Sequence, residues 1–180
     1  MKKICFFNFA FLILLSACTP KQPSVYRGLP KEYTLAYEEI YGHCYDSVPY
    51  AVVALDLYSD GLSLDKDHRI QGTGYNLYLS DILVPDSLLA DGEYTAITDN
   101  QAPLKPYTFL PGRDYEGYPH GMYILSIEES KVTNIQVLDS GSFVCRNDSL
   151  LFTLYYRNAY GYKATYTPVF QGQRIPWLKQ

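Results

Sequence analysis

Apolar and polar residues alternate with a period of two along most of this chain, which is the pattern of β-strands with one buried face. In the clearest stretch, residues 51–58, alanine, valine and leucine fill every odd position. Similar alternation predicts further strands at 75–80, 94–98, 107–110, 122–127, 132–138, 143–145, 150–156 and 162–170. Turn residues separate these segments at intervals of about 8–12 residues, and no strand–helix–strand unit interrupts them.

This pattern predicts an all-β fold with a single antiparallel domain of about eight or nine strands. We favour a lipocalin-like barrel over a two-sheet sandwich. Residues 33–41 fit either a short helix or a strand, and we favour a strand ending at Gly42 because its tyrosine density matches the other strands. We expect one helical turn within residues 85–89 and a turn between two strands at residues 139–142.

A basic and then apolar segment opens the chain. Lys2 and Lys3 precede an apolar run over residues 6–15, which is too short for a bilayer-spanning helix of about 20 residues. The following Leu15-Ser16-Ala17-Cys18 resembles the bacterial lipobox, in which a peptidase cuts before a cysteine that carries lipid. A buried N-terminal helix or a single membrane span fits less well, because polar residues and two prolines follow at once.

The lipobox divides the chain into four parts. We expect residues 1–17 to be a lipoprotein signal peptide and 18–30 a lipidated tether. The antiparallel β domain then covers 31–170, and 171–180 form a C-terminal tail. The tryptophan of that tail, Trp177, either packs back on the domain or belongs to a disordered end. Cys18 is the expected lipidation site, so the first expected partner is the membrane that holds its acyl chains.

The charge of the chain bears on its partners. The full sequence has 15 basic and 19 acidic side chains, for a formal charge of −4. Loss of Lys2 and Lys3 with the signal peptide leaves 13 basic side chains and a charge of about −6. An acidic surface argues against nucleic acid, because binding to phosphates depends on lysine and arginine. It argues equally against electrostatic attachment to anionic lipid.

The cysteines fit an oxidising compartment. Cys5 leaves with the signal peptide and Cys18 takes lipid, so Cys44 and Cys145 remain in the domain. They form a disulfide outside the cytoplasm or stay as two buried free thiols, since cysteine also behaves as a small hydrophobe. No paired cysteine–histidine spacing predicts zinc or another metal, and no motif predicts a cofactor.

Several motifs in a fixed order resemble small all-β lipoproteins of Bacteroides-type gut bacteria, whose functions are mostly unassigned. They are the lipobox, Tyr41-Gly42, and residues 74–79, 89–95, 107–112 and 164–167. Pro168 stands where the family pattern usually carries a glycine. The resemblance implies fold and location and supplies no catalytic residues. In such bacteria acidic residues after the lipid cysteine resemble a surface-export signal, and residues 19–22 lack them. We therefore favour the periplasmic side of the outer membrane over the cell surface.

Catalytic motifs are weak. The three histidines, His43, His68 and His120, lie in unrelated turn-rich settings, without a metal-binding spacing. Gly141-Ser142 lacks the second glycine of a nucleophile elbow. The acidic residues within 60–67 could form either a calcium-binding loop or an ordinary solvent-exposed loop. We favour the solvent-exposed loop, because the spacing of EF-hand ligands is absent. Carboxylates that a glycosidase would need occur only as scattered candidates, namely Asp46, Asp56, Glu93, Asp114 and Glu116.

A binding function has one candidate segment. Residues 113–120 form a long loop that carries Arg113, Tyr115, Tyr118 and His120, and such loops often hold function on a rigid scaffold. The alternative is a plain glycine–proline connection. We therefore expect a lipid-anchored, non-enzymatic binding or accessory module for a small apolar ligand, a glycan or an envelope protein. Two alternatives remain: a hydrolase of polysaccharide or peptide with a scattered active site, and a structural subunit of an outer-membrane assembly.

Overall fold

The computed structural model describes residues 28–45, 48–99 and 103–179, and in these residues all regular structure is β. In chain order the strands are β1 (Glu32–Tyr33), β2 (Leu35–Gly42), β3 (Ala51–Tyr58), β4 (Leu62–Leu64), β5 (Ile70–Gly72), β6 (Gly74–Val84), β7 (Gly92–Ala96), β8 (Thr108–Phe109), β9 (Arg113–Tyr115), β10 (Tyr118–His120), β11 (Met122–Glu128), β12 (Lys131–Arg146), β13 (Ser149–Arg157), β14 (Lys163–Tyr166), β15 (Val169–Gln171) and β16 (Ile175–Leu178).

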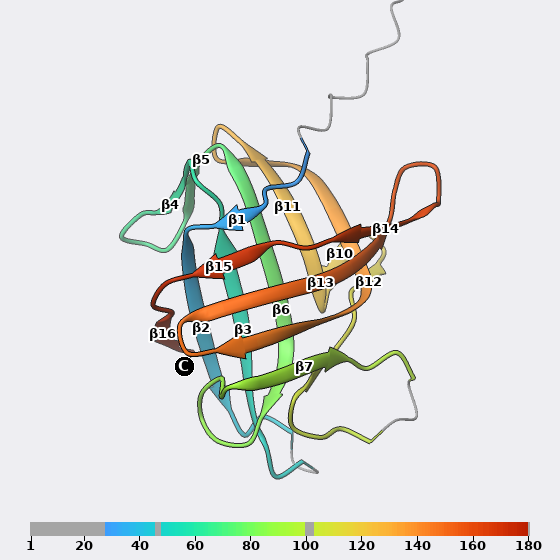
Figure 1. Ribbon diagram of the computed structural model, residues 1–180. Helices are drawn as coiled ribbons and strands as arrows, with labels where there is room; N and C mark the ends of the chain where they lie inside the picture. Colours follow the sequence, from blue (N-terminus) through green and yellow to red (C-terminus); the bar gives the residue numbers. More distant parts are fainter. Residues whose placement is uncertain (1–27, 46–47, 100–102, 180) are drawn as a thin grey trace, which may run out of the picture.

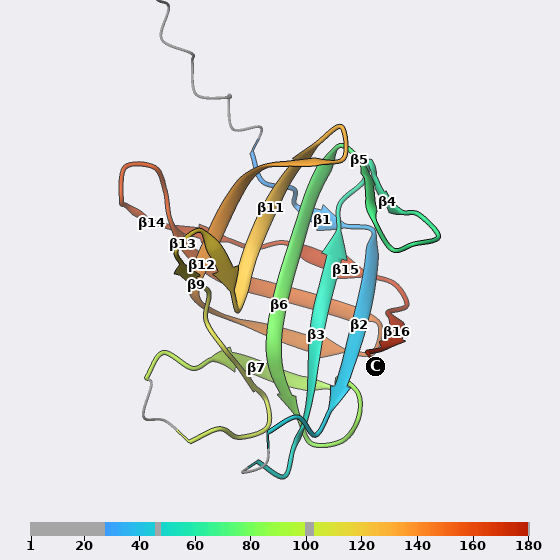
Figure 2. The same cartoon turned by 180° about the vertical axis from the view of Figure 1, so that it is seen from behind.

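Five of these strands close a barrel. β12 pairs with β11 and β7, β6 pairs with β11 and β8, and the parallel pair β7–β8 completes the ring. The sheet continues from β6 through β3 and β2 to β16, and from β12 through β13 and β15 to β1. Figures 1 and 2 show the result as two layers whose strands cross, with β2, β3, β6 and β11 in one and β7, β13 and β15 in the other. The all-β, barrel-like fold expected from the alternation is confirmed.

The long strand β12 joins the two layers. Its first half pairs with β11 and its second half with β13 and β7. A β-bulge between Leu138 and Ser140 bends the strand at this point. Gly141 follows, and a Cβ atom there would lie 2.6 Å from the carbonyl oxygen of Thr153. The expected turn at residues 139–142 is therefore wrong, because glycine and a bulge let the strand bend without ending.

Aromatic side chains fill the interior between the layers. Tyr94 of β7 and Phe143 of β12 stack with ring centroids 4.6 Å apart and planes 2° from parallel. Phe109 and Phe152 contact the same Phe143 ring, at 5.5 and 5.4 Å. All four side chains are buried. The inward positions of β3 and β6 add leucine, valine and alanine, so the predicted apolar face of residues 51–58 lies in this core.

Some of the predicted local secondary structure is confirmed and some is wrong. Residues 35–42 form strand β2 and end at Gly42 as predicted. The segment 85–89 makes bends and no helical turn. The expected strand count was too low for the described residues because several strands have only two or three residues, too few for an alternation to register. Three strand pairs, β1–β15, β16–β2 and β7–β8, are parallel and not antiparallel.

The C-terminal tail is part of the sheet. β16 pairs in parallel with β2, and Trp177 packs edge-on against Tyr37 with ring centroids 6.3 Å apart. Just before this strand, the Arg174 guanidinium lies 3.3 Å from Glu38 Oε2, and both side chains are largely buried. The backbone N–H of Leu89 donates a hydrogen bond to the other oxygen of Glu38. A buried charge is stable only when it is paired and hydrogen-bonded, so this contact ties the tail to the barrel.

Two backbone segments, around Pro111 and Gly121, approach closely just after β10. Gly121 has a φ of 75°, and a Cβ atom there would lie 2.2 Å from the carbonyl oxygen of Pro111. The Gly121 carbonyl accepts a hydrogen bond of 3.0 Å from the Ser80 amide. The β9–β10 hairpin is therefore held against β6 at a place that has no room for a side chain.

We expect Gly121→Ala to destabilise the protein more than Gly161→Ala, measured as the free energy of unfolding in urea. Gly161 is the matched control, since its φ is 80° and nothing lies within 4 Å of its Cβ position. The control carries only the left-handed backbone cost of about 1–2 kcal/mol. Gly121→Ala adds a steric cost of about 1–3 kcal/mol. Equal losses in the free energy of unfolding of the two variants would contradict the close backbone approach at Gly121.

Candidate functional site

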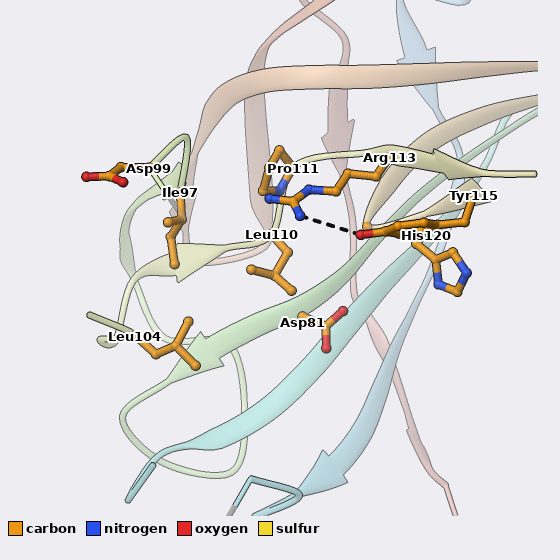
Figure 3. A pocket seen from close by; sticks show the side chains of 10 residues that line it. Asp81, Ile97, Asp99, Leu104, Leu110, Pro111, Arg113, Tyr115 and His120 are labelled. Atoms are coloured by element: carbon orange, nitrogen blue, oxygen red, sulfur yellow. Dashed lines mark hydrogen bonds between the residues drawn. The ribbon is translucent and has the colours of Figure 1, made fainter. Parts of the chain in front are cut away.

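A pocket of about 570 Å³ opens beside the β9–β10 hairpin. Its walls come from β6, from the segments that follow β7 and β8, and from the hairpin itself, as Figure 3 shows. Its volume lies in the range of about 300–1,000 Å³ that is usual for small-molecule sites. The pocket is lined by Asp81, Ile97, Asp99, Leu104, Leu110, Pro111, Arg113, Tyr115, His120 and Gly121.

The predicted binding loop at residues 113–120 is a β-hairpin and not a long loop. Glu116 and Gly117 form its two-residue turn with φ values of 54° and 88°, as a type I′ turn requires. The register places Tyr118 opposite Tyr115 and His120 opposite Arg113. Strand alternation therefore puts all four predicted side chains on one face of the hairpin.

Three of these four residues line the pocket. The Arg113 guanidinium donates a long hydrogen bond of 3.5 Å to the Tyr115 hydroxyl, and the His120 ring meets the Tyr115 ring edge-on at 5.2 Å. Figure 3 shows these side chains together at one end of the pocket. Tyr115 keeps 53% of its surface exposed. Tyr118 is 73% exposed and lies beside the turn, outside the pocket lining.

Asp81 is a pocket residue that the sequence analysis missed. It interrupts β6 at a bulge, where its φ of 54° turns the strand. The Tyr45 hydroxyl donates a hydrogen bond to Asp81 Oδ1 at 2.5 Å, and the Ser80 hydroxyl donates to Oδ2 at 2.6 Å. Burial, followed by the hydrogen bond to Asp81, raises the pKa of Tyr45, which keeps that hydroxyl a donor. The Asp81 carboxylate is thus held in place by the Tyr45 and Ser80 hydroxyls.

A signal for this bulge exists in the sequence. The β6 residues of the main apolar core fall on odd numbers at Leu77 and Leu79 and on even numbers at Ile82 and Val84. Such a change of phase requires one extra residue in the strand, which is the definition of a bulge. Bulges are frequent beside active sites because they redirect a side chain.

The rest of the pocket is a mixture of apolar and charged groups. Ile97, Leu104 and Leu110 lie at the end away from the hairpin, with Asp81 between the two groups in the view of Figure 3. Asp99 adds a second carboxylate to the lining. The arrangement offers hydrogen-bond acceptors, one guanidinium, a half-exposed aromatic ring and an apolar wall to one ligand.

A second group of polar side chains lies on the outer face of β2, β3 and β6, and we call it the acid–tyrosine cluster: Glu39, Tyr41, Asp56, Tyr58, Asn76, Tyr78 and Lys179. Glu39 Oε2 accepts hydrogen bonds from the hydroxyls of Tyr41 at 2.8 Å and Tyr78 at 3.1 Å, and its Oε1 lies 2.7 Å from the Lys179 ammonium. Asp56 accepts hydrogen bonds from the Tyr58 hydroxyl and from the Asn76 amide, the latter at 2.5 Å.

Burial raises the pKa of Asp56 to about 6, more than its two hydrogen bonds lower it. A raised pKa is one mark of a catalytic acid. However, both carboxylates of the acid–tyrosine cluster are buried and their oxygens are bonded within the chain. Neither residue is in the lining of the pocket. The acid–tyrosine cluster is therefore a stabilising network of β2, β3, β6 and the C-terminal segment.

The other predicted chemical groups do not converge. Glu93 is exposed on β7, whereas Asp114 accepts a hydrogen bond of 2.8 Å from the Gly117 amide within the β9–β10 turn. Asp46 lies outside the described residues. Asp65 accepts two backbone hydrogen bonds of 2.9 Å within its own turn, in agreement with a solvated loop. His68 stacks on Trp177 at 4.2 Å. In the described ranges no group of three or more histidine, cysteine or acidic residues is placed to hold a metal ion.

The two domain cysteines do not form a disulfide. Cys145 is buried and Cys44 is exposed, and both are free thiols. Burial raises the pKa of the Cys145 thiol. The expected disulfide is not formed in the structure, and of the two thiols expected to be buried only Cys145 is buried.

Comparison of the chain with protein-family models, curated proteins and solved structures found no match in any of the three. The resemblance to Bacteroides-type lipoproteins therefore stays a prediction. Cys18 and the rest of the lipobox lie outside the described residues. Within the described part of the chain, no helix has the length and apolar character needed to cross a membrane.

We expect the raised pKa of Asp56 to make stability fall as pH rises. The folded protein keeps this proton up to about pH 6, whereas the unfolded chain releases it near the ordinary value of 3.8. The free energy of unfolding therefore falls by about 3 kcal/mol as pH rises through that window. Asp56→Asn removes this fall, measured by urea unfolding between pH 4 and pH 7. The control Asp67→Asn, at an exposed carboxylate, retains it. An unchanged pH profile in Asp56→Asn would contradict the assignment.

Proposed function

We propose that this protein is a lipid-anchored, non-enzymatic binding module of the bacterial envelope, and that its ligand is a glycan held in the pocket beside the β9–β10 hairpin. The observation that carries the proposal is the combination, in one pocket, of a half-exposed tyrosine ring with oriented polar groups. Tyr115 supplies the ring, and Asp81 and Arg113 supply the polar groups.

The chemistry of the lining fits a sugar. A sugar ring has apolar faces that stack on an aromatic side chain and hydroxyl groups that need both donors and acceptors. Arg113 offers donors, Asp81 and Asp99 offer acceptors, and Tyr115 offers its ring. A purely apolar ligand suits the pocket less, because it would remove water from charged groups without replacing their hydrogen bonds.

The state of the carboxylates favours binding over hydrolysis. A glycosidase needs two carboxyl groups that face the same bond, one of them with a raised pKa. Asp56 has such a pKa, but it belongs to the acid–tyrosine cluster and not to the pocket lining. Asp81 is bonded through both oxygens to Tyr45 and Ser80, which suits a positioned acceptor.

The envelope location rests on the N-terminal sequence. Leu15-Ser16-Ala17-Cys18 carries the lipobox pattern, and nine residues separate Cys18 from Gly28, where the described structure begins. The acidic charge of the mature chain leaves covalent acyl chains as the link to the membrane. We place the protein on the periplasmic side of the outer membrane, because residues 19–22 lack acidic side chains.

We expect Tyr115→Ala to weaken glycan binding by up to about tenfold, the value of one aromatic contact. Binding is measured by calorimetry after a screen of neutral hexose and N-acetylhexosamine oligomers. Tyr118→Ala is the matched control, because it removes an exposed tyrosine from the same face of the hairpin without touching the pocket. Equal loss in both variants would place the ligand elsewhere. Absence of any glycan binding, or release of new reducing ends by the wild type, would refute the proposal.

We expect Cys18→Ala to abolish lipid attachment while Cys44→Ala leaves it intact. The lipobox cysteine is the only acyl acceptor in this proposal, and Cys44 is exposed on the folded domain. Incorporation of a labelled fatty acid in a bacterial host and the protein's membrane fraction report the result. Labelling that persists in Cys18→Ala would disprove the lipobox assignment.

A further inference from the structure

The turn between β13 and β14 presents two tyrosines to solvent. Tyr160 is 85% exposed and Tyr162 is 72% exposed. The turn is nevertheless ordered by its own bonds, because the Asn158 side-chain oxygen accepts hydrogen bonds of 3.0 Å from the amides of both tyrosines. The Asn158 backbone amide in turn donates to the Tyr162 carbonyl at 2.9 Å. We call Asn158–Tyr162 the tyrosine tip. A built turn that holds two large rings in water calls for a surface that covers them.

The tyrosine tip lies close to the point where the chain enters the domain. Tyr166, the last residue of β14, donates a hydrogen bond of 2.7 Å from its hydroxyl to the carbonyl oxygen of Pro30. Tyr166 follows Tyr162 by four positions, which is about 13 Å of extended chain. Figures 1 and 2 both show the β13–β14 turn and the first described residues at the same end of the barrel.

The length of chain before the structure brings this end near the membrane. Nine residues join Cys18 to Gly28, and the ten Cα–Cα steps between the two residues span at most about 36 Å when fully extended. If Cys18 carries lipid, as proposed above, the tyrosine tip is therefore within reach of the bilayer that holds the acyl chains. Segments 97–99 and 103–110, which contribute part of the pocket wall, lie at the opposite end of the barrel in both views.

The side chains around the tip match a membrane interface. Tyrosine is enriched at the level of lipid headgroups, because its ring is apolar and its hydroxyl is wet. Arg157 and Lys163 face each other across the base of the hairpin. The Arg157 side chain donates to the Gly161 carbonyl at 3.3 Å and lies 3.8 Å from the Asp139 carboxylate, yet it stays 70% exposed. Long basic side chains with an exposed head group are common at a membrane interface. Lys163 also covers the Tyr155 ring at 4.1 Å.

We infer that the tyrosine tip is a membrane-interface contact, in which Tyr160 and Tyr162 enter the headgroup layer of the bilayer that holds the lipid anchor. The contact rests on the proposed anchor for its proximity. Two tyrosines bind a bilayer weakly, and the tether supplies the high effective concentration that keeps them there. The contact orients the domain so that segments 97–99 and 103–110 of the pocket wall lie on the side away from the membrane.

The test places a tryptophan at the tip and measures its depth in the bilayer. The mature chain, residues 18–180, carries Trp177→Phe and Cys44→Ser and is coupled through Cys18 to a maleimide lipid in phosphatidylcholine vesicles. Cys145 is buried, so Cys18 is then the reactive thiol. Tyr160→Trp reports on the tip, and Tyr118→Trp, at the exposed turn of the β9–β10 hairpin, is the matched control.

Lipids brominated near the headgroup should quench roughly half of the tryptophan emission of the Tyr160→Trp variant, because its indole ring lies at the interface. The same emission should shift to the blue on coupling to the vesicles. The emission of the Tyr118→Trp control should not change. Equal quenching in both variants, or none in Tyr160→Trp, overturns the inference. If Trp177→Phe does not fold, the same variants are measured with Trp177 present and the signal of the parent protein is subtracted.

The coupling makes this result independent of the proposed function. Chemical attachment replaces cellular lipidation, and the pocket plays no part in the readout. If Cys18 is not acylated in cells, the proposed anchor is refuted. The depth of the indole ring in the chemically coupled Tyr160→Trp protein is measured independently of that result. Normal acylation together with unquenched emission from Tyr160→Trp would refute the membrane contact of the tyrosine tip alone.

Discussion

The structure depends on bending two strands far enough to close a narrow barrel. A ring of five strands requires strong twist, and β12 must pass from one layer to the other within its sixteen residues. The bulge between Leu138 and Ser140 provides the bend, and Gly141 allows the neighbouring strand to approach. β6 has a corresponding bulge near Asp81. With both bends in place, apolar side chains from the two layers can share the stacked aromatic core around Phe143.

The same bends place the candidate pocket. The bulge in β6 turns Asp81 out of the strand alternation and into the pocket, where Tyr45 and Ser80 hold its carboxylate. The crossing at Gly121 presses the β9–β10 hairpin against this part of β6. Closure of the barrel and construction of the pocket therefore use the same backbone irregularities, which explains why a rigid all-β frame can carry a site at its edge.

Two charge pairs hold the C-terminal segment to β2, in addition to the β16–β2 pairing and the Trp177 ring contacts. Arg174 binds the buried Glu38 on one face of β2, and Lys179 binds Glu39 on the other. Because consecutive residues of a strand point to opposite faces, these two adjacent glutamates reach both the core side and the outer acid–tyrosine cluster. Removing either basic residue would leave a buried carboxylate without its ion pair, which is costly in a low-dielectric environment. Within the described residues, the segment 171–179 is in this way part of the sheet.

The period-two pattern by itself determined that the chain is all-β, that residues 51–58 have an apolar inner face, and that β2 ends at Gly42, because these follow from local alternation and turn chemistry. It also singled out Arg113, Tyr115, Tyr118 and His120, since aromatic and charged residues are concentrated there, although Tyr118 lies outside the pocket lining. Only the tertiary structure decided the rest. The strand through residues 139–142 depends on a bulge. The parallel pairing of β16 with β2 and the convergence of Asp81 with the hairpin bring together residues that are distant in sequence, and the free state of Cys44 and Cys145 is likewise set by the fold. Local alternation carries no information about which distant segments meet, because that choice is made by burial and charge pairing across the whole fold.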